Sequence, residues 1–355
     1  MNILHLHTEI NNTCGISKTI YLITKYSNPQ FRHFVICLKG DAIDKFKKND
    51  INIKQLNINN ISLINHIKIL KIIKLFVKEN NIDIIHSHHR YFDFISSFLS
   101  PKIKIKKIAS VQSIVYKKTN LSYKSEILLA AGKSVKEHLT NYFKIPDYRI
   151  IVFNNFIDTT ENKISEEKLL LLNRLKIPEN SYVIGYAGRF SIEEKGIDIL
   201  LKAFKIFNNK NKNSYLVMAG EGQTYPEKLK TFKNVILVTA NINIFDYYNI
   251  FNCVVLPSRV DPFPLVALEA GLMKIPFIGS DVNGISEIIS HSKDGLLFKK
   301  ENVEELVNNM EYFYTHPIES RKIAENLYNK IINNYTVEKS LIKLEDIYIK
   351  LMNTA

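Results

Sequence analysis

Residues 260–271 read Val-Asp-Pro-Phe-Pro-Leu-Val-Ala-Leu-Glu-Ala-Gly and predict a loop followed by a helix. The run before them, Cys253–Leu256, is short, apolar and rich in β-branched residues, which is typical of a buried parallel strand. Pro264 favours the start of a helix, because its missing N–H costs nothing in the first turn. Gly271 is of the residue type that often ends a helix. The pattern therefore predicts a strand, a loop and a helix.

The start of this helix is a candidate site for an anion. The N–H groups from about Leu265 onward lack helical partners, and phosphate binds well to such an end. Asp261 lies in the loop and Glu269 lies about five residues into the helix. Carboxylates do not bind phosphate, but they accept hydrogen bonds from sugar hydroxyls. A diphosphate with one sugar on each side would explain both carboxylates; the alternative is a loop aspartate and a helix glutamate that face solvent.

The rest of the chain alternates strands with helices in the same way. In the second half, strands are predicted at 182–187, 215–219, 235–238, 253–256 and 276–280, helices at 197–207, 244–251 and 285–290, a hairpin-like segment at 295–298, and helices from 303 onward. In the first half, strands are predicted at 2–7, 34–38, 51–56, 82–86, 103–111, 127–131 and 150–157, and helices at 14–26 and 63–79. Such alternation predicts open parallel sheets with helices on both faces and ligands at the carboxyl edge of the strands.

The length of 355 residues suits two domains better than one core. We expect an α/β fold with two Rossmann-like parallel-sheet domains, at 1–158 and 181–335. Residues 159–180 are polar and mixed, which indicates a linker with a short helix. A helix at 336–355 is expected to pack back on the first domain. Two similar open sheets joined by one linker predict a cleft between facing carboxyl edges.

Arg189 and Lys195 supply the positive charge that a phosphate would need. Arg189 follows the first predicted strand of the second half, and Lys195 stands just before the next predicted helix, so both belong to the carboxyl edge of that sheet. Two fixed cations there would stabilise the charge on a departing nucleoside diphosphate. For Arg189 the alternative is a surface ion pair with Glu193 or Glu194.

These motifs resemble, in their order, those of the family-4 retaining nucleotide-sugar glycosyltransferases, which have the two-domain GT-B architecture. The similarity is strongest over residues 183–298. It is carried by Gly-Arg-Phe…Glu-Lys-Gly at 188–196, Ala-Gly-Glu-Gly at 219–222, Leu-Pro-Ser…Leu-Glu-Ala at 256–270 and Gly-Ser-Asp-Val-Asn-Gly-Ile-Ser-Glu-Ile-Ile at 279–289. Milder similarity covers 83–88 and 154–158, so the resemblance spans nearly the whole chain.

The resemblance assigns roles to individual residues. Arg189 and Lys195 match the pair that binds the diphosphate, Glu269 matches the carboxylate that holds the ribose hydroxyls, and Asp261 takes the place of a glutamate that touches the donor sugar. Arg189, Lys195 and Asp261 are therefore the candidate catalytic residues. Further donor-binding candidates are Gly15, Gln112, Gly222, Phe263, Pro264, Leu265 and Val266. His88 belongs to a strand-end motif that lines the cleft on the acceptor side; its alternative role is structural.

Three positions depart from the family pattern. Asp261 is one methylene shorter than glutamate, Pro262 replaces a glycine, and Gln112 stands where many members have a histidine. Glutamine donates and accepts hydrogen bonds but takes no proton at pH 7. The resemblance implies front-face attack, in which the departing phosphate oxygen takes the proton of the acceptor hydroxyl, and this scheme needs neither a general base nor a metal. No Asp-x-Asp pair is present, and Asp41 with Asp44 fits a solvated turn better than a ligand pair.

The net charge of +13 is unevenly distributed. Residues 1–157 hold 24 Lys and Arg against 10 Asp and Glu, whereas the remaining 198 residues hold 24 against 25. The excess in the first half indicates attraction to an anionic membrane or acceptor, with the lysines of 68–78 and 102–107 as candidate contacts. The alternatives are AT-rich coding bias and an ordinary solvated face. Nucleic-acid binding is not expected, because no basic motif is interleaved with aromatic residues.

The remaining features indicate the cytoplasm. Cys14, Cys37 and Cys253 are isolated, without disulfide or zinc spacing, which suits a reducing compartment. No run of 18 apolar residues is present, and a strand starting at Asn2 leaves no room for a signal peptide. We expect the protein at the inner face of the plasma membrane.

The sequence therefore predicts a retaining hexosyltransferase without cofactor or metal. It would move a sugar from a nucleoside-diphosphate sugar, a UDP-sugar in preference to a GDP-sugar, to a glycan or lipid-linked acceptor in bacterial surface polysaccharide synthesis (lipopolysaccharide, capsule or a related glycan). The domain at 1–158 would bind the acceptor and the domain at 181–335 the donor. The alternatives are a non-catalytic partner subunit with the GT-B fold and a nucleotide-sugar 2-epimerase.

Overall fold

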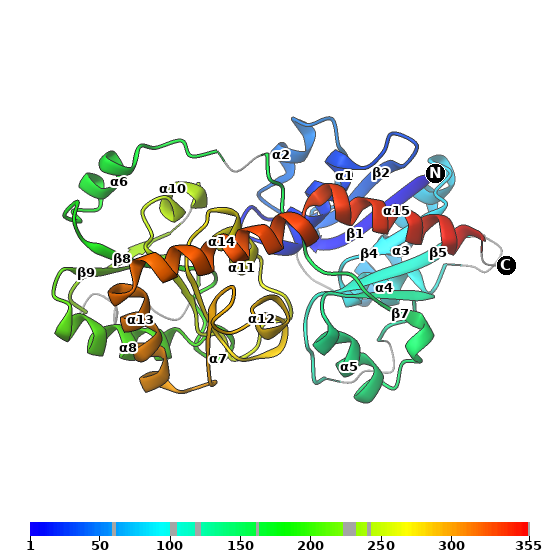
Figure 1. The fold of residues 1–355 in the computed structure, drawn as a ribbon. Coiled ribbons are helices and arrows are strands. Elements are labelled where there is room, and N and C mark those ends of the chain that lie inside the picture. The colour runs from blue at the N-terminus through cyan, green and yellow to red at the C-terminus, as the bar shows by residue number, and fades with distance from the viewer. Residues whose placement is uncertain are drawn as a thin grey trace. The chain divides into compact units, whose positions relative to one another are not determined.

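A computed structural model describes residues 1–58, 62–99, 105–117, 122–160, 163–222, 232–239 and 243–353. The chain divides into two units, each with its own parallel sheet (Figure 1). Unit 1 comprises Met1–Asn155 and Val337–Ala355, and unit 2 comprises Phe156–Thr336. Among the described residues, no helix combines the length and the apolar character needed to cross a bilayer.

Unit 1 is built on a seven-stranded sheet of order β3-β2-β1-β4-β5-β6-β7. Its elements are β1 (Asn2–Glu9), α1 (Gly15–Tyr26), β2 (Arg32–Lys39), α2 (Ile43–Lys47), β3 (Asn52–Gln55), α3 (Leu63–Glu79), β4 (Ile84–Ser87), α4 (Arg90–Ser96), β5 (Lys106–Val111), β6 (Ile127–Ala130), α5 (Lys133–Asn141), the 3₁₀ turn η1 (Asp147–Arg149), β7 (Ile150–Val152) and α15 (Val337–Asn353). The strand order reverses between β1 and β4, and ligands of doubly wound sheets bind outside the carboxyl ends of strands at such a point.

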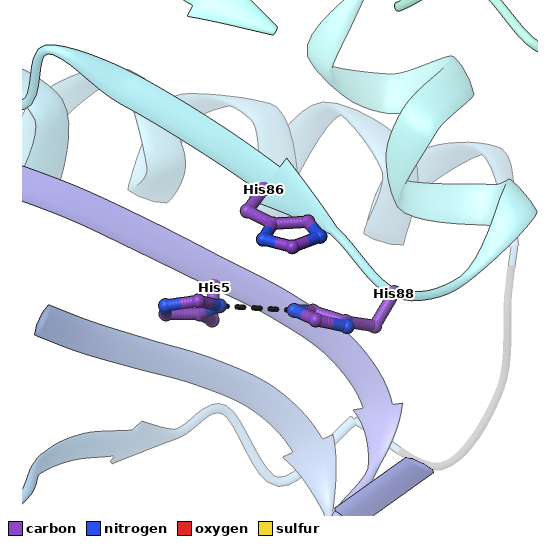
Figure 2. Close-up of side chains that lie close together, drawn as sticks. All are labelled: His5, His86 and His88. Atoms are coloured by element: carbon purple, nitrogen blue, oxygen red, sulfur yellow. Dashed lines mark hydrogen bonds between the residues drawn. The ribbon is translucent and has the colours of Figure 1, made fainter. Parts of the chain in front are cut away.

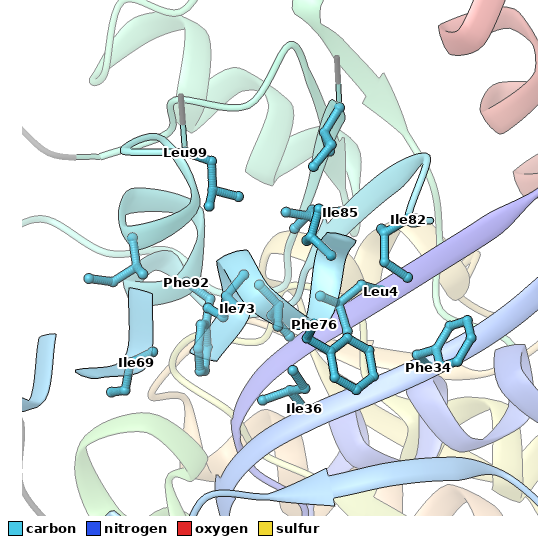
Figure 3. Packing of buried hydrophobic residues seen from close by; sticks show 14 of the residues in the cluster. Leu4, Phe34, Ile36, Ile69, Ile73, Phe76, Ile82, Ile85, Phe92 and Leu99 are labelled. Atoms are coloured by element: carbon cyan, nitrogen blue, oxygen red, sulfur yellow. The ribbon is translucent and has the colours of Figure 1, made fainter. Parts of the chain in front are cut away.

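The core of unit 1 shows how the sequence pattern becomes packing (Figure 3). Leu4, Phe34 and Ile85 come from β1, β2 and β4, and they meet Ile73 and Phe76 from α3. Residues three or four apart on a helix share a face, so α3 presents an apolar face to the sheet and its opposite face to solvent. Burial of each such side chain contributes about 1.5–3 kcal/mol to stability, and this packing holds β1 beside β4.

Helix α15 completes unit 1. Figure 1 shows it running beside α1, and the two helices pack together. Tyr348 is fully buried and its hydroxyl lies 2.7 Å from Nδ1 of His86 in β4. Glu345 accepts a hydrogen bond from the N–H of Asn28 at 2.8 Å. The last helix of the chain thus belongs to the first unit.

Unit 2 repeats the design with six parallel strands in the order β10-β9-β8-β11-β12-β13. Its elements are α6 (Lys168–Arg174), β8 (Tyr182–Ala187), α7 (Ile192–Lys195), α8 (Ile197–Lys210), β9 (Ser214–Ala219), β10 (Val235–Val238), α10 (Ile244–Tyr248), β11 (Cys253–Leu256), α11 (Leu265–Leu272), β12 (Phe277–Ser280), α12 (Asn283–Ile288), β13 (Leu296–Phe298), α13 (Val303–Thr315) and α14 (Pro317–Asn334). The reversal falls between β8 and β11, so the loops after these two strands form the candidate ligand edge.

Two local predictions are wrong. The hairpin-like segment at 295–298 is a parallel strand, β13, in which Leu296 pairs with Ile278 of β12. Gly271 does not end its helix, which runs to Leu272. Instead it lets α14 approach, because a Cβ at Gly271 would lie 2.7 Å from a carbon of Ile331. Periodicity alone does not distinguish a short parallel strand from a hairpin arm, nor a packing glycine from a cap.

Two further predictions concern the expected linker and the basic run at 102–107. Residues 159–180 were expected to link the domains, but the described ones lie in unit 2, where the N–H groups of Ser165 and Glu166 donate to the Asp246 carboxylate at 2.6 and 3.1 Å. The basic run 102–107 falls partly outside the described residues; within it, Lys106 and Lys107 begin β5.

Candidate functional site

No side chain among the described residues caps the start of α11. Pro264 precedes the helix in an extended conformation (φ −72°, ψ 126°), and no side-chain hydrogen bond to the first N–H groups is found among the described residues. The first turn also carries no acidic residue. A helix start of this kind attracts an anion, because its free N–H groups and the helix dipole favour negative charge.

The side chains of Lys195 and Asp261 meet in the segment that precedes α11. The Nζ atom of Lys195 lies 2.5 Å from Oδ2 of Asp261, and the two side chains are 19% and 6% exposed. Ser258 also lies near, with its hydroxyl 3.4 Å from the same oxygen. The structure therefore brings together two of the three predicted catalytic residues, one from α7, which follows β8, and one from the loop after β11.

Gly196 makes this pairing possible. It ends α7 in the left-handed conformation (φ 61°), and a Cβ there would lie 2.1 Å from the carbonyl oxygen of Pro257. Only glycine fits so close to the end of β11 in this conformation. The preceding residue, Lys195, is consequently held next to residues 258–261.

Arg259 ties the segment before α11 to α7, a role that the sequence analysis missed. Its guanidinium donates to both carboxylate oxygens of Asp198 at 2.8 and 3.0 Å and to Glu301, and it also bonds the carbonyl oxygen of Ile192 in α7. Its backbone N–H donates to the carbonyl oxygen of Glu194 at 2.7 Å. The fork of the guanidinium suits this bidentate geometry, so Arg259 positions the segment that carries Lys195.

Arg189 forms the ion pair that was the alternative to phosphate binding. Its guanidinium contacts the carboxylate of Glu194, and both side chains are more than half exposed. Exposed pairs of this kind contribute only about 0–1 kcal/mol, so a diphosphate would compete for Arg189 at little cost. The hydroxyl of Tyr186 donates to the carbonyl oxygen of Arg189 at 2.7 Å and holds its backbone.

Glu269 is buried within unit 2 and accepts a hydrogen bond from the hydroxyl of Tyr248 at 3.0 Å. Burial, reinforced by the negative charge of Glu269, raises the pKa of Tyr248 well above its usual value. The phenol therefore stays protonated and remains a donor. One carboxylate oxygen of Glu269 is thus fixed in place by a residue that the sequence motif did not reveal.

The glycines near the site have structural reasons of their own. A Cβ at Gly222 would lie 2.4 Å from the carbonyl oxygen of Phe190, and one at Gly284 would lie 1.8 Å from that of Pro262. The N–H of Gly284 donates to the carbonyl oxygen of Asp261 at 2.9 Å. Close backbone packing of neighbouring loops thus explains these residues, and donor binding by Gly222 stays a prediction.

The predicted contacts at 263–266 divide by burial. The ring of Phe263 is buried and lies edge-on to Tyr335 at a centroid distance of 5.4 Å. Phe263 therefore packs inside unit 2 and has only its backbone to offer a donor. Leu265 and Val266 are half-buried, in the first turn of α11.

The remaining predicted residues lie in unit 1. His88 and Gln112 both line a cavity of about 410 Å³, and Gly15 begins α1 immediately before Ile16, which also lines it. The cavity is bordered by α4 and by the carboxyl end of β5. It therefore lies near the carboxyl ends of β1 and β4, between which the strand order reverses. Its wall combines aromatic rings with polar groups; the lining residues are Ile16, His66, His88, His89, Arg90, Tyr91, Phe94, Ser110, Val111, Gln112, Ser113, Val115 and Tyr123.

Four buried histidines, His5, His33, His86 and His88, gather at this cavity with His88 in its wall, and no motif connects them. Figure 2 shows three of them, His5, His86 and His88. Nδ1 of His5 lies 2.9 Å from Nε2 of His88, and Nε2 of His5 lies 2.8 Å from Nδ1 of His33. His86 bonds Tyr348 and Ser110 through its two ring nitrogens, at 2.7 and 2.8 Å. The alternation of His5 with Leu4 and Leu6 is the signal that would have placed it inside the sheet.

Burial keeps these rings neutral. Desolvation is the largest cause that lowers the pKa of His5, His86 and His88 well below 6.5, and neighbouring imidazoles lower it further. The pKa of His33 falls to about 4, again chiefly because of burial. Each ring therefore carries one N–H at neutral pH and can donate only one hydrogen bond.

His5, His86 and His88 come close enough together to suggest a metal site, because one nitrogen of each lies within 4.8 Å of the others. The ring geometry does not fit one. His86 and His88 stack with centroids 4.0 Å apart and planes only 25° apart, whereas a shared metal must lie near both ring planes. Both ring nitrogens of His5 and of His86, and Nε2 of His88, are also engaged in the hydrogen bonds given above, whereas Nδ1 of His88 has no partner among the described residues. The cluster is therefore a hydrogen-bonded network, and no metal is assigned to it.

Comparisons with known proteins agree with this geometry. Residues 169–330 match the model of the family described as "Glycosyl transferases group 1". The whole chain superposes on HepE of Anabaena, solved in complex with UDP-glucose, with a TM-score of 0.85, 17% identity and coverage of 99% and 100% of the two chains. The GT-B fold is thereby confirmed. Residues 169–330 are thus similar to group 1 glycosyl transferases, whereas the likeness to HepE shows the fold.

Three relatives are more similar to this chain in sequence than HepE is, but they match a smaller share of it. An uncharacterized glycosyltransferase of Methanocaldococcus jannaschii is 27% identical over 63% of this chain, and the capsular polysaccharide biosynthesis glycosyltransferase CapM of Staphylococcus aureus is 29% identical over 48%. The chain spans 64% and 47% of the lengths of these two proteins. UDP-Gal:alpha-D-GlcNAc-diphosphoundecaprenol alpha-1,3-galactosyltransferase of Escherichia coli is 23% identical over 92% of this chain and 90% of its own length.

Proposed function

We propose that this chain is a retaining hexosyltransferase that moves a sugar from a nucleoside-diphosphate sugar to a glycan or lipid-linked acceptor in bacterial surface polysaccharide synthesis. The observation that carries the proposal is the Lys195–Asp261 pair beside the uncapped start of α11. A UDP-sugar is preferred over a GDP-sugar, because HepE was solved with UDP-glucose and the E. coli relative is named for UDP-Gal. The names of CapM and of the E. coli relative support a glycan or diphospholipid acceptor.

The donor side follows from the residues of unit 2. The N–H groups at the start of α11 and the ammonium of Lys195 bind the diphosphate, and Arg189 joins them on leaving Glu194. Glu269, held by Tyr248, accepts hydrogen bonds from ribose hydroxyls. Asp261 accepts from a hydroxyl of the donor sugar while it keeps Lys195 in place.

The transfer step needs no separate base. The acceptor oxygen forms a bond to the anomeric carbon on the face from which the phosphate leaves, the bond from that carbon to the phosphate oxygen breaks, and this oxygen takes the acceptor's proton. The positive charges of Lys195 and Arg189 stabilise the negative charge that develops on the diphosphate. The neutral side chain of Gln112 is compatible with this scheme, because no step requires it to take a proton.

A thermal-shift screen tests the donor assignment. UDP, GDP, ADP and CMP, with their sugars, are added separately, and UDP compounds are expected to raise the melting temperature most. A ligand at 100 times its dissociation constant adds about 2.7 kcal/mol of stability. Release of sugar from the donor by the purified protein would then separate an enzyme from a non-catalytic partner subunit, and the configuration of the released sugar would show retention. Failure of every nucleotide to stabilise the protein would contradict the proposal.

A chelator provides the control for the mechanism. Because the charge of the diphosphate is met by Lys195, Arg189 and the start of α11, we propose that transfer and donor hydrolysis continue in excess EDTA. Loss of activity with EDTA, restored by a divalent cation, would show that a metal takes part. Conversion of the donor into its 2-epimer instead of transfer would favour the epimerase alternative.

We further propose that α3 docks on an anionic membrane at the cytoplasmic face. Lys68, Lys71, Lys74 and Lys78 are all exposed on this helix. The same solvent face carries apolar side chains that remain unburied: Ile64 is 79%, Ile67 53% and Leu75 58% exposed. Basic and apolar residues that share one helical face suit the interface of an anionic bilayer.

Charge reversal on α3 tests this docking. The double variant Lys71→Glu/Lys74→Glu is expected to lose at least about 2 kcal/mol of binding to anionic vesicles, roughly 30-fold, since each lysine near the surface contributes about 1 kcal/mol. Co-sedimentation with vesicles of phosphatidylglycerol in phosphatidylcholine measures it. Lys339→Glu/Lys343→Glu on α15 is the matched control. Equal binding of both variants, or binding that ignores the phosphatidylglycerol content, would rule out docking through α3.

A further inference from the structure

A chain of hydrogen bonds connects α15 to the wall of the unit 1 cavity. The hydroxyl of Tyr348 lies 2.7 Å from Nδ1 of His86, and Nε2 of His86 lies 2.8 Å from Oγ of Ser110. Tyr348 and His86 are fully buried, whereas Ser110 is half-buried and lines the cavity. A buried group on the last helix thus reaches the cavity through a single imidazole.

The direction of these bonds follows from counting hydrogens. The neutral ring of His86 has one N–H, so it donates to one neighbour and accepts from the other. Burial raises the pKa of Tyr348 well above its usual value, and its hydroxyl therefore keeps its hydrogen. Among the described residues, the hydroxyl of Tyr348 has His86 as its hydrogen-bond partner. Donation to Nδ1 satisfies that hydrogen, whereas acceptance from Nδ1 would leave it buried and unused.

The direction of these bonds also decides which hydrogen bonds Ser110 can make. If Tyr348 donates to Nδ1, the hydrogen of His86 is on Nε2 and is donated to Oγ of Ser110. The serine oxygen is thereby an acceptor on its buried side, and its own hydrogen is directed elsewhere. Since Ser110 lines the cavity, that hydrogen is available to an oxygen of a bound ligand.

The packing around His86 holds this arrangement in place. The ring of His88 stacks on that of His86 at 4.0 Å, and the ring of Tyr348 lies edge-on to it at 5.8 Å. His88 is itself held by His5 (Figure 2). A ring that is stacked on His88 and hydrogen-bonded through both of its nitrogens is held against rotation, so a change of hydrogen-bond direction at Ser110 requires a change of tautomer.

We propose that Tyr348 is a positioning residue that, through His86, makes Ser110 a hydrogen-bond donor to a saccharide in the unit 1 cavity. This proposal rests on the proposed function, with the saccharide as the acceptor of the transfer. The lining suits a sugar ring, because Tyr91, Phe94 and Tyr123 provide aromatic surface. Within the described part of the chain, the hydroxyl of Tyr91 and Nε2 of His66 are buried without a hydrogen-bond partner, which leaves polar atoms for a hydroxylated ligand.

The tautomer of His86 is directly measurable. In ¹⁵N-histidine-labelled protein, the long-range ¹H–¹⁵N spectrum is expected to show His86 with its hydrogen on Nε2. Tyr348→Phe removes only the hydroxyl, so Nδ1 loses its donor and the population with hydrogen on Nδ1 should rise. In that tautomer Nε2 accepts from Ser110, and the cavity loses a donor. A wild-type His86 with its hydrogen on Nδ1 would overturn the proposal.

Ligand binding gives the second readout. Methyl glycosides of glucose, galactose and N-acetylglucosamine are used as probes by saturation-transfer difference NMR. Tyr348→Phe and Ser110→Ala are each expected to weaken the binding of the best glycoside by about tenfold, the effect of one hydrogen bond. Ser110→Ala should do so without changing the tautomer of His86, so it remains informative if Tyr348→Phe folds poorly. Wild-type binding in Ser110→Ala, or no binding of any glycoside to the wild type, would overturn the proposal.

Two controls separate this proposal from the donor assignment. Tyr247→Phe removes another buried tyrosine hydroxyl, in unit 2, where it accepts from Arg174, and it should change neither the His86 spectrum nor glycoside binding. The thermal shift produced by UDP depends on unit 2 and should be the same in Tyr348→Phe and in the wild type. A missing UDP shift in the wild type would count against the proposed function alone, because the tautomer of His86 is read without any nucleotide.

Discussion

Replacement of Lys195 by alanine is expected to lower kcat for sugar transfer by roughly 10²–10³-fold, the usual effect of removing one group that stabilises charge in a transition state. The structure also predicts a loss of stability. Asp261 is buried against Lys195, and removal of one partner of a buried pair costs about 3–5 kcal/mol. Transfer assays with UDP-sugars and urea unfolding of the same variant measure the two effects separately.

The double variant Lys195→Ala/Asp261→Asn separates catalysis from folding. Without the ammonium, a neutral amide at position 261 leaves no buried charge unpaired, so stability should return toward that of the wild type. Activity should stay low, because the diphosphate still lacks its cation. Lys205→Ala, an exposed lysine on α8, is the matched control for loss of one charge. A double variant that transfers sugar at nearly the wild-type rate would show that Lys195 merely pairs with Asp261.

Acid is expected to unfold unit 1 between about pH 6.5 and pH 4. His7 and His33 have their pKa values lowered to about 4, and those of His5, His86 and His88 lie well below 6.5. Below pH 6.5 the unfolded chain takes up protons that the native state does not. Stability is therefore complete above pH 6.5 and is lost as the pH falls, by about 1.4 kcal/mol per pH unit for each such histidine.

Five such residues together approach the whole stability of a typical domain within one or two pH units. Urea unfolding followed by circular dichroism at several pH values tests this. His33→Gln removes one titrating ring and should lower the pH of half-unfolding, whereas His291→Gln, on the exposed surface of unit 2, should not. A stability of unit 1 that is constant from pH 7 to about pH 4 would contradict neutral buried histidines.

The alternation of strands and helices was predictable because it is local. The segment from Cys253 to Gly271 contains its own signals for a strand, a loop and a helix, and the structure has β11 and α11 there. The sequence also placed Lys195 and Asp261 in segments that follow strands of one parallel sheet, and the structure has their side chains in contact at its carboxyl edge. Arg189 was harder to place, since its neighbour Glu194 competes for it at close range.

Pairings between distant segments were not predictable in this way. His5 and His86 are opposite one another only because β1 lies beside β4, and Tyr348 reaches them only because α15 packs in unit 1. Tyr248 likewise acts on Glu269 from an element that carries no motif of its own. Arg259 stands inside the motif at 256–270, but its partners Asp198 and Glu301 do not belong to any motif. Motifs record residues that are close in sequence, whereas hydrogen-bond partners depend on which strands become neighbours.

The amino-acid sequence by itself determined the two-sheet α/β fold, the edge of each sheet that carries polar loops and the residue types at the start of α11, since periodicity and turn chemistry are properties of short segments. Only the tertiary structure decided that Lys195 is paired with Asp261, that Arg189 is paired with Glu194, and that four histidines are buried together at the cavity of unit 1. The physical reason is that burial and strand order are set by the packing of the whole chain, and these in turn set the charge and hydrogen-bond direction of each side chain.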